Sequence, residues 1–291
     1  MSLVPPVMLY VPATEPSKTA KALTLPAGAV ILDLEDAVAP SAKPDARIAG
    51  ASSLASPAAE GPQRWVRMNE VGGPHWVDDL IAVVRPGLDG IVVPKVESGA
   101  TLTRLDGALA VLERDRGLGP VPLLGIIETP AGFAALDDIA GASPRLKCLG
   151  FGAGDFSELT GIAYPAVNGG AAALLTWART QLVLVSSRAG LEPPHDSVYG
   201  RYADLDGLRA EAVFARQLGF SGKHAIHPTQ LAPLNEAFAI GAAEIEQARR
   251  VVEAYERALA ADSGAVGVDG LLVDEPIARR ARQLLERAGE R

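Results

Sequence analysis

The chain has 291 residues, of which 48% are hydrophobic and 21% charged, and this composition excludes a largely disordered protein. The net charge of −8 disfavours binding to nucleic acids and to anionic membranes, but it does not exclude a small anionic ligand. The single cysteine, Cys148, excludes an intrachain disulfide. Since we find neither a signal peptide nor an apolar stretch long enough to span a membrane, we expect a cytoplasmic protein.

Eight short apolar runs recur along the chain, separated by segments with helical periodicity. Most runs are rich in residues that favour β-strands, and several lead into Pro, Gly or Asp, as expected of buried strands. Between them, Leu205–Leu218 is one example of a segment whose apolar residues fall on a single helical stripe. The predicted strands are Val7–Pro12, Val30–Asp36, Arg64–Asn69, Gly90–Lys95, Leu123–Thr129, Lys147–Asp155, Pro193–Val198 and Lys223–Pro228.

Eight strand–helix units in a chain of this length predict a closed (β/α)8 TIM barrel over residues 1–240. An open doubly wound sheet is the rival, but no Gly-x-Gly-x-x-Gly turn follows the first strand. Residues 241–291 form an extension with two predicted helices, Ala242–Ala260 and Ile277–Ala288. We expect a flexible joint at Asp262–Gly270. The extension could cap its own barrel or contact a neighbouring subunit.

Polar residues end most of the predicted strands, and in a TIM barrel these ends form the active-site mouth. Strand alternation places Asp33 and Glu35 on one face of the second strand and Asp36 on the other. The other strand-end residues are Arg67, Lys95, Glu128, Asp155 and His227. The sequence therefore predicts a strongly charged mouth.

Glu128 and Asp155 follow neighbouring strands, and two close carboxylates repel each other unless a proton or a cation lies between them. Oxygen ligands of this kind suit Mg²⁺, which often takes one or two carboxylates and fills its coordination shell with water and substrate. Two satisfied structural acids are the alternative. Arg67 would bind a carboxylate through its planar guanidinium.

Lys95 is the lysine best placed for Schiff-base chemistry, but nearby acids should keep it charged, whereas a Schiff-base amine must be neutral. Asp33 or Glu35 paired with Lys95 could instead be a purely structural ion pair. His224 and His227 cannot share a metal, because residues three apart on a strand face opposite sides. We interpret His224 as a structural histidine.

Eight motifs in order along the chain resemble the citrate lyase β-subunit-like branch of the HpcH/HpaI aldolase family. The motifs are LYVPATEP at 9–16, ILDLEDAV at 31–38, VRMNEVGG at 66–73, VVPKVES at 92–98, IIETPAGF at 126–133, GFGAGDFSELTG at 150–161, KHAIHPTQL at 223–231 and LVDEPIARRA at 272–281. The resemblance implies a barrel that is usually trimeric, with Mg²⁺ held by Glu128 and Asp155 in its mouth. It implies that Arg67 binds the substrate and that Asp274, delivered from an adjacent subunit, is the catalytic acid/base.

The resemblance also implies that Tyr10 and Lys21 contact the CoA part of a thioester. The expected function is a Mg²⁺-dependent retro-aldol cleavage of a citryl-, malyl- or citramalyl-CoA type of thioester to a 2-oxo acid and an acyl-CoA. Asp33, Glu35 and Lys95 would not bind the metal themselves but would orient the metal-bound water and the neighbouring side chains. The alternatives are a metal-dependent 2-oxo-acid aldolase, a malyl-CoA hydrolase, or the β subunit of a citrate lyase complex that acts on an acyl-carrier thioester.

Overall fold

The computed structural model describes residues 4–55, 61–163 and 170–290 of the chain. Within these ranges the chain divides into two compact units, Val4–Phe238 and a second unit that begins at Ala239. Each unit buries its own hydrophobic side chains, so each has a core of its own. We describe the two units separately.

The first unit is built around a closed barrel of eight parallel strands in sequential order, which confirms the predicted TIM-barrel fold. Each strand begins within three residues of its predicted start, but most end earlier than expected, so several of the polar residues follow the strands rather than end them. The seventh is reduced to two residues. The strands are β1 Val7–Pro12, β2 Ala29–Asp33, β3 Gln63–Arg67, β4 Gly90–Val93, β5 Leu123–Ile127, β6 Leu146–Phe151, β7 His195–Asp196 and β8 Gly222–Ala225.

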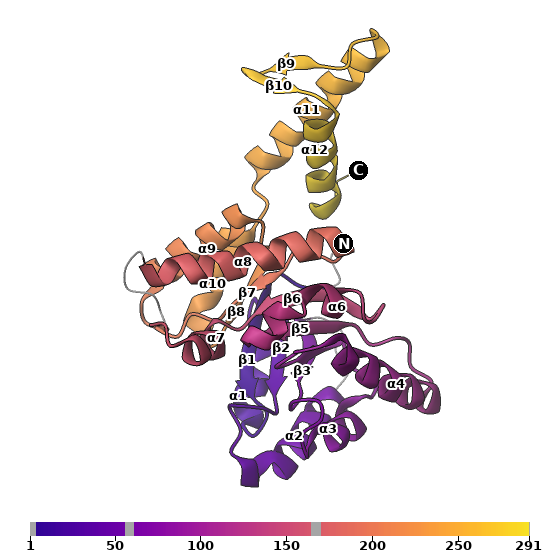
Figure 1. The fold of residues 1–291 in the computed structure, drawn as a ribbon, viewed down its shortest axis with the longest axis vertical. Helices are drawn as coiled ribbons and strands as arrows, with labels where there is room; N and C mark the ends of the chain where they lie inside the picture. The colour runs from indigo at the N-terminus through magenta and orange to yellow at the C-terminus, as the bar shows by residue number, and fades with distance from the viewer. Residues whose placement is uncertain (1–3, 56–60, 164–169, 291) are drawn as a thin grey trace. The chain divides into compact units, whose positions relative to one another are not determined.

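Helices surround the strands in the first unit (Figure 1). Helix α9 has the bounds that the apolar stripe predicted. None of the helices in the described part of the chain has the length and apolar character of a membrane span. The helices are α1 Pro16–Ala22, α2 Lys43–Ala55, α3 Trp76–Val83, α4 Gly99–Arg116, α5 Pro130–Ala134, α6 Leu136–Ala140, α7 Ala153–Thr160, α8 Gly170–Ala189, α9 Leu205–Leu218 and α10 Leu231–Phe238.

Strand alternation divides the apolar residues of the barrel into two layers. One set points into the barrel, where Met8, Ile31, Trp65, Leu124 and Cys148 form a cluster that is fully buried. The other set points outward and packs beneath the helices in the larger cluster. Because both faces of the strands are covered, the strands are continuously apolar rather than alternating. Cys148 is a buried free thiol, as expected of a core cysteine.

The second unit consists of two helices and a β-hairpin. Helices α11 Ala242–Ala260 and α12 Glu275–Arg287 enclose a small core with β9 Val266–Val268 and β10 Leu271–Val273. The predicted flexible joint at Asp262–Gly270 is therefore wrong, since β9 lies within it and pairs with β10. Asp269 and Gly270 both have positive φ (49° and 82°), and an Asp-Gly pair in this conformation makes a tight two-residue turn.

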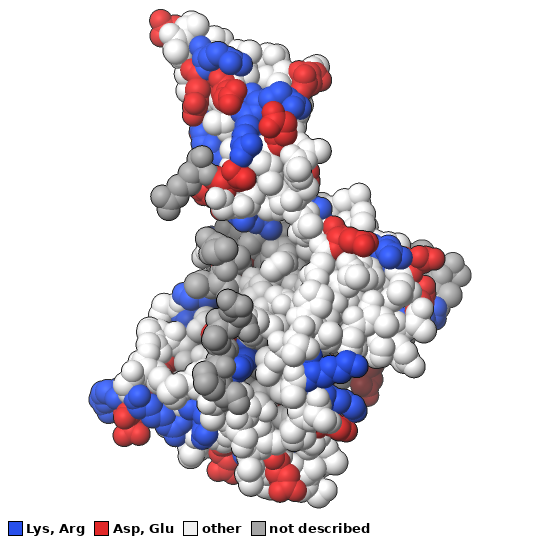
Figure 2. Space-filling model, turned by 180° about the vertical axis from the view of Figure 1, so that it is seen from behind, with Lys and Arg blue, Asp and Glu red and all other residues white. Residues whose placement is uncertain are grey.

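The surface of the second unit carries mixed charges. Arginine side chains lie among acidic ones on its face in Figure 2. Several of these charges form exposed ion pairs, such as Arg250 with Asp269 and Arg282 with Glu275. The hairpin also exposes Leu271 and Leu272, which are 47% and 68% accessible.

Candidate active site

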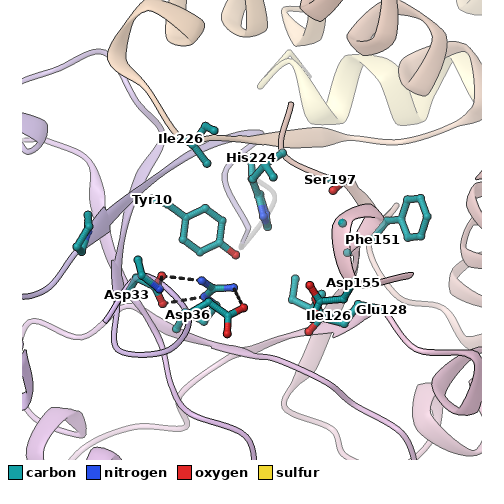
Figure 3. A pocket seen from close by; sticks show the side chains of 16 residues that line it. Tyr10, Asp33, Asp36, Ile126, Glu128, Phe151, Asp155, Ser197, His224 and Ile226 are labelled. Carbon is teal, nitrogen blue, oxygen red and sulfur yellow. Dashed lines mark hydrogen bonds and ion pairs between the residues drawn. The ribbon is translucent and has the colours of Figure 1, made fainter. Parts of the chain in front are cut away.

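A pocket of about 450 Å³ lies at the carboxyl ends of the barrel strands. Its lining comes from seven of the eight strands or from the segments that directly follow them, and Figure 3 shows the side chains that it gathers. The residues that line it are Tyr10, Pro12, Asp33, Asp36, Ala37, Arg67, Ile126, Glu128, Phe151, Gly152, Gly154, Asp155, Ser197, Val198, His224 and Ile226.

Four of the residues expected in the mouth line this pocket: Asp33, Arg67, Glu128 and Asp155. Asp33 and Arg67 end β2 and β3, and Glu128 directly follows β5. Asp155 lies in the first turn of α7, so its predicted place at the end of a strand is wrong. The cause is that β6 ends at Phe151 and Gly152 turns the chain into the helix.

Asp36 also lines the pocket, although strand alternation predicted the opposite face for it. The alternation no longer applies there, because β2 ends at Asp33 and the chain bends. Asp33 holds this bend through its carboxylate, which accepts hydrogen bonds from the backbone N–H of Glu35 at 2.9 Å and of Ala37 at 3.3 Å. The acidic segment after β2 is therefore folded over the mouth.

Arg67 is held from two sides. Its Nε and Nη2 donate to the two carboxylate oxygens of Asp33 at 2.8 and 2.6 Å, and its Nη1 lies 2.8 Å from Glu35. The guanidinium also lies over the ring of Tyr10, 4.8 Å from its centre. Burial opposes the charge, but the hydrogen bond with Asp33 and the charges of Asp33 and Glu35 outweigh it and raise the pKa of Arg67. The guanidinium is thus rigidly oriented at the pocket wall.

Lys95 contributes both its backbone and its side chain. Its φ of 49° is left-handed, and its N–H donates to Oε1 of Glu128 at 2.8 Å. Its ammonium lies 2.8 Å from Glu35, 3.6 Å from Asp36 and 3.9 Å from Asp155. Despite partial burial, these acids raise the pKa of Lys95. The ammonium therefore stays charged, as expected, and is unsuited to Schiff-base formation.

The structure also identifies which acid pairs with Lys95. The sequence left Asp33 and Glu35 as equal candidates. Glu35 is the partner, while Asp33 pairs with Arg67.

Glu128 and Asp155 lie side by side at the pocket wall, with their oxygens toward the cavity (Figure 3). Burial, and then the charge of Asp155, raise the pKa of Glu128 to about 8. Burial and the charge of Asp36 likewise raise the pKa of Asp155. Gly152 makes room for this arrangement, because a Cβ there would lie 2.3 Å from Oε2 of Glu128. The raised pKa values show that nearby Lys95 and Arg67 do not fully offset the burial and mutual repulsion of these two carboxylates.

This acid pair fits a hard divalent cation. No group of three or more His, Cys, Asp or Glu side chains that could enclose a metal occurs among the described residues. A metal here would have at most two carboxylate ligands from this unit, and Mg²⁺ commonly takes so few and keeps several waters.

A histidine of the pocket wall pairs with a second, fully buried histidine in a way that the sequence did not predict. His224 lines the pocket, and its Nε2 lies 3.3 Å from Nδ1 of His195 on the neighbouring strand. The edge of its ring also meets Tyr10, with 5.5 Å between ring centres. The pairing depends on the register of β7 and β8, which joins His195 to Gly222. His227 lies farther out and contacts the exposed ring of Tyr202.

The remaining predicted site residues lie elsewhere in the chain. Lys21 is an exposed residue in the last turn of α1 and does not line the pocket. Asp274 belongs to the second unit, where it is the N-cap of α12 and accepts a hydrogen bond from the backbone N–H of Ile277 at 3.3 Å. Tyr10, by contrast, lies in the pocket wall beside Arg67.

A polar pocket at the carboxyl ends of the strands is the place where TIM-barrel enzymes have their active sites, so fold and pocket together indicate an enzyme. The sequence model of the family "HpcH/HpaI aldolase/citrate lyase" matches residues 6–228. The chain belongs to this family, which confirms the resemblance found in the sequence and the expected class of enzyme, a lyase.

Individual relatives match over nearly the whole chain. The citrate lyase subunit beta of Haemophilus influenzae is 33% identical over 285 residues, covering 97% of this chain and 96% of the relative. The L-malyl-CoA/beta-methylmalyl-CoA lyase of Rhodobacter capsulatus is 32% identical, covering 96% and 93%. The crystal structure of CitE from Mycobacterium tuberculosis, in complex with magnesium, acetoacetate and coenzyme A, is 30% identical and covers 98% of both chains with a TM-score of 0.79.

Proposed function

We propose that this protein is a Mg²⁺-dependent lyase that cleaves a 3-hydroxy-acyl-CoA of the malyl, citramalyl or citryl type into a 2-oxo acid and an acyl-CoA. The observation that carries the proposal is the pair of adjacent carboxylates, Glu128 and Asp155, whose raised pKa values mark a site short of positive charge. The two curated relatives, one a CoA-thioester lyase and the other a citrate lyase subunit, support this reaction class. The CitE structure supports both the metal and the thioester carrier.

Glu128 and Asp155 would hold the metal, whose role when bound is that of a Lewis acid that draws electrons from the hydroxyl and carboxylate of the substrate. Lys95 orients Glu128 through its backbone N–H. Its ammonium pairs with Glu35 and so offsets part of the negative charge of the acidic segment that follows β2. Because Asp33 fixes the plane of Arg67, the guanidinium can face the substrate oxygens in one orientation.

The cleavage itself is a retro-aldol step. The substrate hydroxyl loses its proton to water in the mouth and becomes the carbonyl of the 2-oxo acid. The adjacent C–C bond breaks, and its electron pair passes to the thioester as an enolate. Asp274, as the carboxylic acid, then gives its proton to the enolate carbon and is reprotonated by solvent.

We further propose that the protein is a cytoplasmic homotrimer in which the second unit of one subunit supplies Asp274 to the mouth of a neighbour. The exposed leucines of the hairpin, close in sequence to Asp274, are the kind of surface that a second subunit would cover. Tyr10 and Lys21 would contact the CoA portion, Tyr10 inside the pocket and Lys21 outside it.

Replacing either acid tests the proposal. Glu128→Ala and Asp155→Ala should each abolish Mg²⁺-dependent cleavage of a panel of malyl- and citramalyl-CoA esters, and chelation with EDTA should do the same to the wild type. Glu158→Ala is the matched control, because Glu158 is an exposed carboxylate one turn along the same helix α7 as Asp155. Unchanged rates in either active-site variant would refute the metal assignment.

The citrate lyase relative favours a second candidate function. Here the protein would act as the β subunit of a complex and take its acyl group from a carrier protein. The same metal site would serve both reactions. The assay that separates them compares a free CoA ester with the same acyl group on an acyl-carrier protein.

A further inference from the structure

His195 and His224 form a buried pair beneath the mouth of the barrel. Their accessible fractions are 0% and 3%, and their rings meet edge to face with 5.4 Å between centres. Burial lowers the pKa of His195 to about 3 and, together with nearby positive charges, lowers the pKa of His224 as well. Both imidazoles are therefore neutral, and each carries its one proton on one of its two nitrogens.

The geometry decides which nitrogen of His224 faces the cavity. Its Nε2 is occupied by Nδ1 of His195 at 3.3 Å. The two nitrogens of an imidazole point in widely different directions, so Nδ1 of His224 is turned away from His195. Within residues 4–55, 61–163 and 170–290 this Nδ1 has no hydrogen-bond partner, and His224 lines the pocket between Tyr10 and Ser197 (Figure 3).

The unused nitrogen of His195 indicates where the shared proton lies. Nε2 of His195 is buried and has no hydrogen-bond partner among the described residues. If His224 donated to His195, the proton of His195 would sit on this Nε2 as a buried, unpaired N–H, which proteins rarely tolerate. If His195 donates instead, Nε2 is only an unused lone pair. The second arrangement leaves the proton of His224 on Nδ1, the nitrogen that faces the pocket.

The charges of the pocket wall divide it into two halves. Asp33, Asp36, Glu128 and Asp155 lie on the side of β2, β5 and α7. Tyr10, Ser197, Val198, His224 and Ile226 lie on the side of β7, β8 and β1 and carry no charge. A substrate with an anionic acid end for the metal and an uncharged thioester end fits this division in one orientation.

We propose that His224 is a further catalytic residue, whose Nδ1–H donates a hydrogen bond to the thioester oxygen of the substrate. This inference rests on the proposed CoA-thioester substrate. The hydrogen bond strengthens when the C–C bond breaks, because the electron pair then moves onto that oxygen as the enolate. His195 is the positioning residue that keeps the proton of His224 on the cavity side.

The tautomer can be measured without substrate. Long-range ¹⁵N–¹H correlation spectra of the full-length, ¹⁵N-histidine-labelled protein distinguish a protonated Nδ1 from a protonated Nε2. We expect His224 in the Nδ1–H form. His195→Asn should keep it there, because the asparagine amide can replace the Nδ1 donor, and His195→Leu should release it. An Nε2–H form in the wild type would overturn the proposal and leave the proposed lyase function standing.

The partner oxygen is tested by binding rather than turnover. We would compare acetyl-CoA with S-ethyl-CoA, a thioether of the same length that lacks the carbonyl oxygen, by isothermal titration calorimetry with Mg²⁺ present. The wild type should prefer acetyl-CoA by about tenfold, the worth of one hydrogen bond to an otherwise unpaired donor. His224→Leu should abolish the preference, and His224→Asn should keep much of it, because its amide can occupy the place of Nδ1.

The outcomes separate the two proposals. Equal preference in wild type and His224→Leu would overturn the role of His224 while CoA binding itself survived. Failure of the wild type to bind either compound would instead contradict the CoA-thioester function and the ligand of His224 with it. For cleavage, His224→Leu should lower kcat by roughly 100-fold, as for the loss of an oxyanion donor, with His224→Asn between the two.

Discussion

The environment of Glu128 disfavours the ionised form of its side chain. It is 6% exposed and faces a second carboxylate, and among the described residues its one hydrogen-bond donor is the backbone N–H of Lys95. A residue in this state binds a proton where an ordinary glutamate would not. Proton and metal therefore compete for the same oxygens, so metal affinity should rise with pH up to about 8.

This environment predicts a pH-dependent stability of the metal-free protein. The pKa of Glu128 is raised from 4.5 to about 8, so the folded state binds the extra proton between these values and loses stability as the pH rises through that window. Glu128→Gln removes the loss. In EDTA at pH 8.5, urea unfolding should find the variant more stable than wild type by roughly 4 to 5 kcal/mol.

The comparison at pH 4.5 is the internal reference, because protonated Glu128 and Gln are nearly equivalent and the two proteins should then unfold alike. Glu158→Gln, on the exposed face of α7, should follow the wild type at both pH values. Parallel pH profiles for wild type and Glu128→Gln would contradict the raised pKa.

For single residues, the sequence predicts which residues belong to the site better than it predicts which side chains they pair with. The strand ends indicated Glu128, Asp155 and Arg67, since an acid or a cation that closes an apolar run is rarely accidental. The choice between Asp33 and Glu35 as partner of Lys95 needed coordinates, because β2 ends at Asp33 and alternation then fails. The His195–His224 contact joins residues 29 positions apart through strand register, which the residue types alone do not encode.

Asp274 also has a structural role in helix α12. Its side chain caps α12, and Pro276 in the first turn suits a helix start. The residue therefore has two possible reasons to be an aspartate, namely capping and proton transfer.

Two substitutions separate these roles. Asp274→Asn keeps a good N-cap and removes the acid, so turnover should be lost with little change in stability. Asp274→Ala loses both, and its unfolding free energy should fall by about 1 kcal/mol as well. Steady-state rates and urea denaturation measure the two effects. Glu275→Gln, the neighbouring acid, serves as the control, and an active Asp274→Asn enzyme would rule out acid/base catalysis by this residue.

The same part of the chain shows where sequence reasoning about elements fails. The helices at Ala242–Ala260 and Leu205–Leu218 were predicted to the residue, because long stripes with clear ends leave few alternatives. The glycine-rich stretch before Gly270 looked like a joint. It is a hairpin because Asp-Gly supplies the positive φ of a tight turn, and a three-residue strand carries too weak a pattern to be recognised.

Glu128 and Asp155 lie in the barrel, and Asp274 lies in the second unit. In the proposed trimer, each active site would therefore combine residues from two chains. Subunit mixing tests this. Glu128→Ala and Asp274→Asn should each be inactive alone, but random mixing by co-expression should restore activity at about a quarter of the sites, those that combine an intact residue from each chain.

Light scattering should give a mass three times 30.2 kDa for every sample, so that lost activity is not mistaken for lost assembly. If the mixed trimers stay as inactive as their parents, Asp274 serves the mouth of its own chain.

The closure of the barrel was predictable from the sequence because eight recurring strands have few other arrangements. Subunit contacts leave no comparable periodic signal in the sequence.

The side chains of Met8, Trp65 and Cys148 fill the barrel beneath the pocket, so within the described residues the cavity does not continue downward. Substrate and products must therefore enter and leave through the same opening of the pocket. In the proposed reaction the substrate leaves in two pieces. The 2-oxo acid would sit against Glu128, behind the acyl-CoA, whose nucleotide part would extend to the rim of the pocket. The acyl-CoA should therefore depart first, and an excess of it should block the exit of the 2-oxo acid.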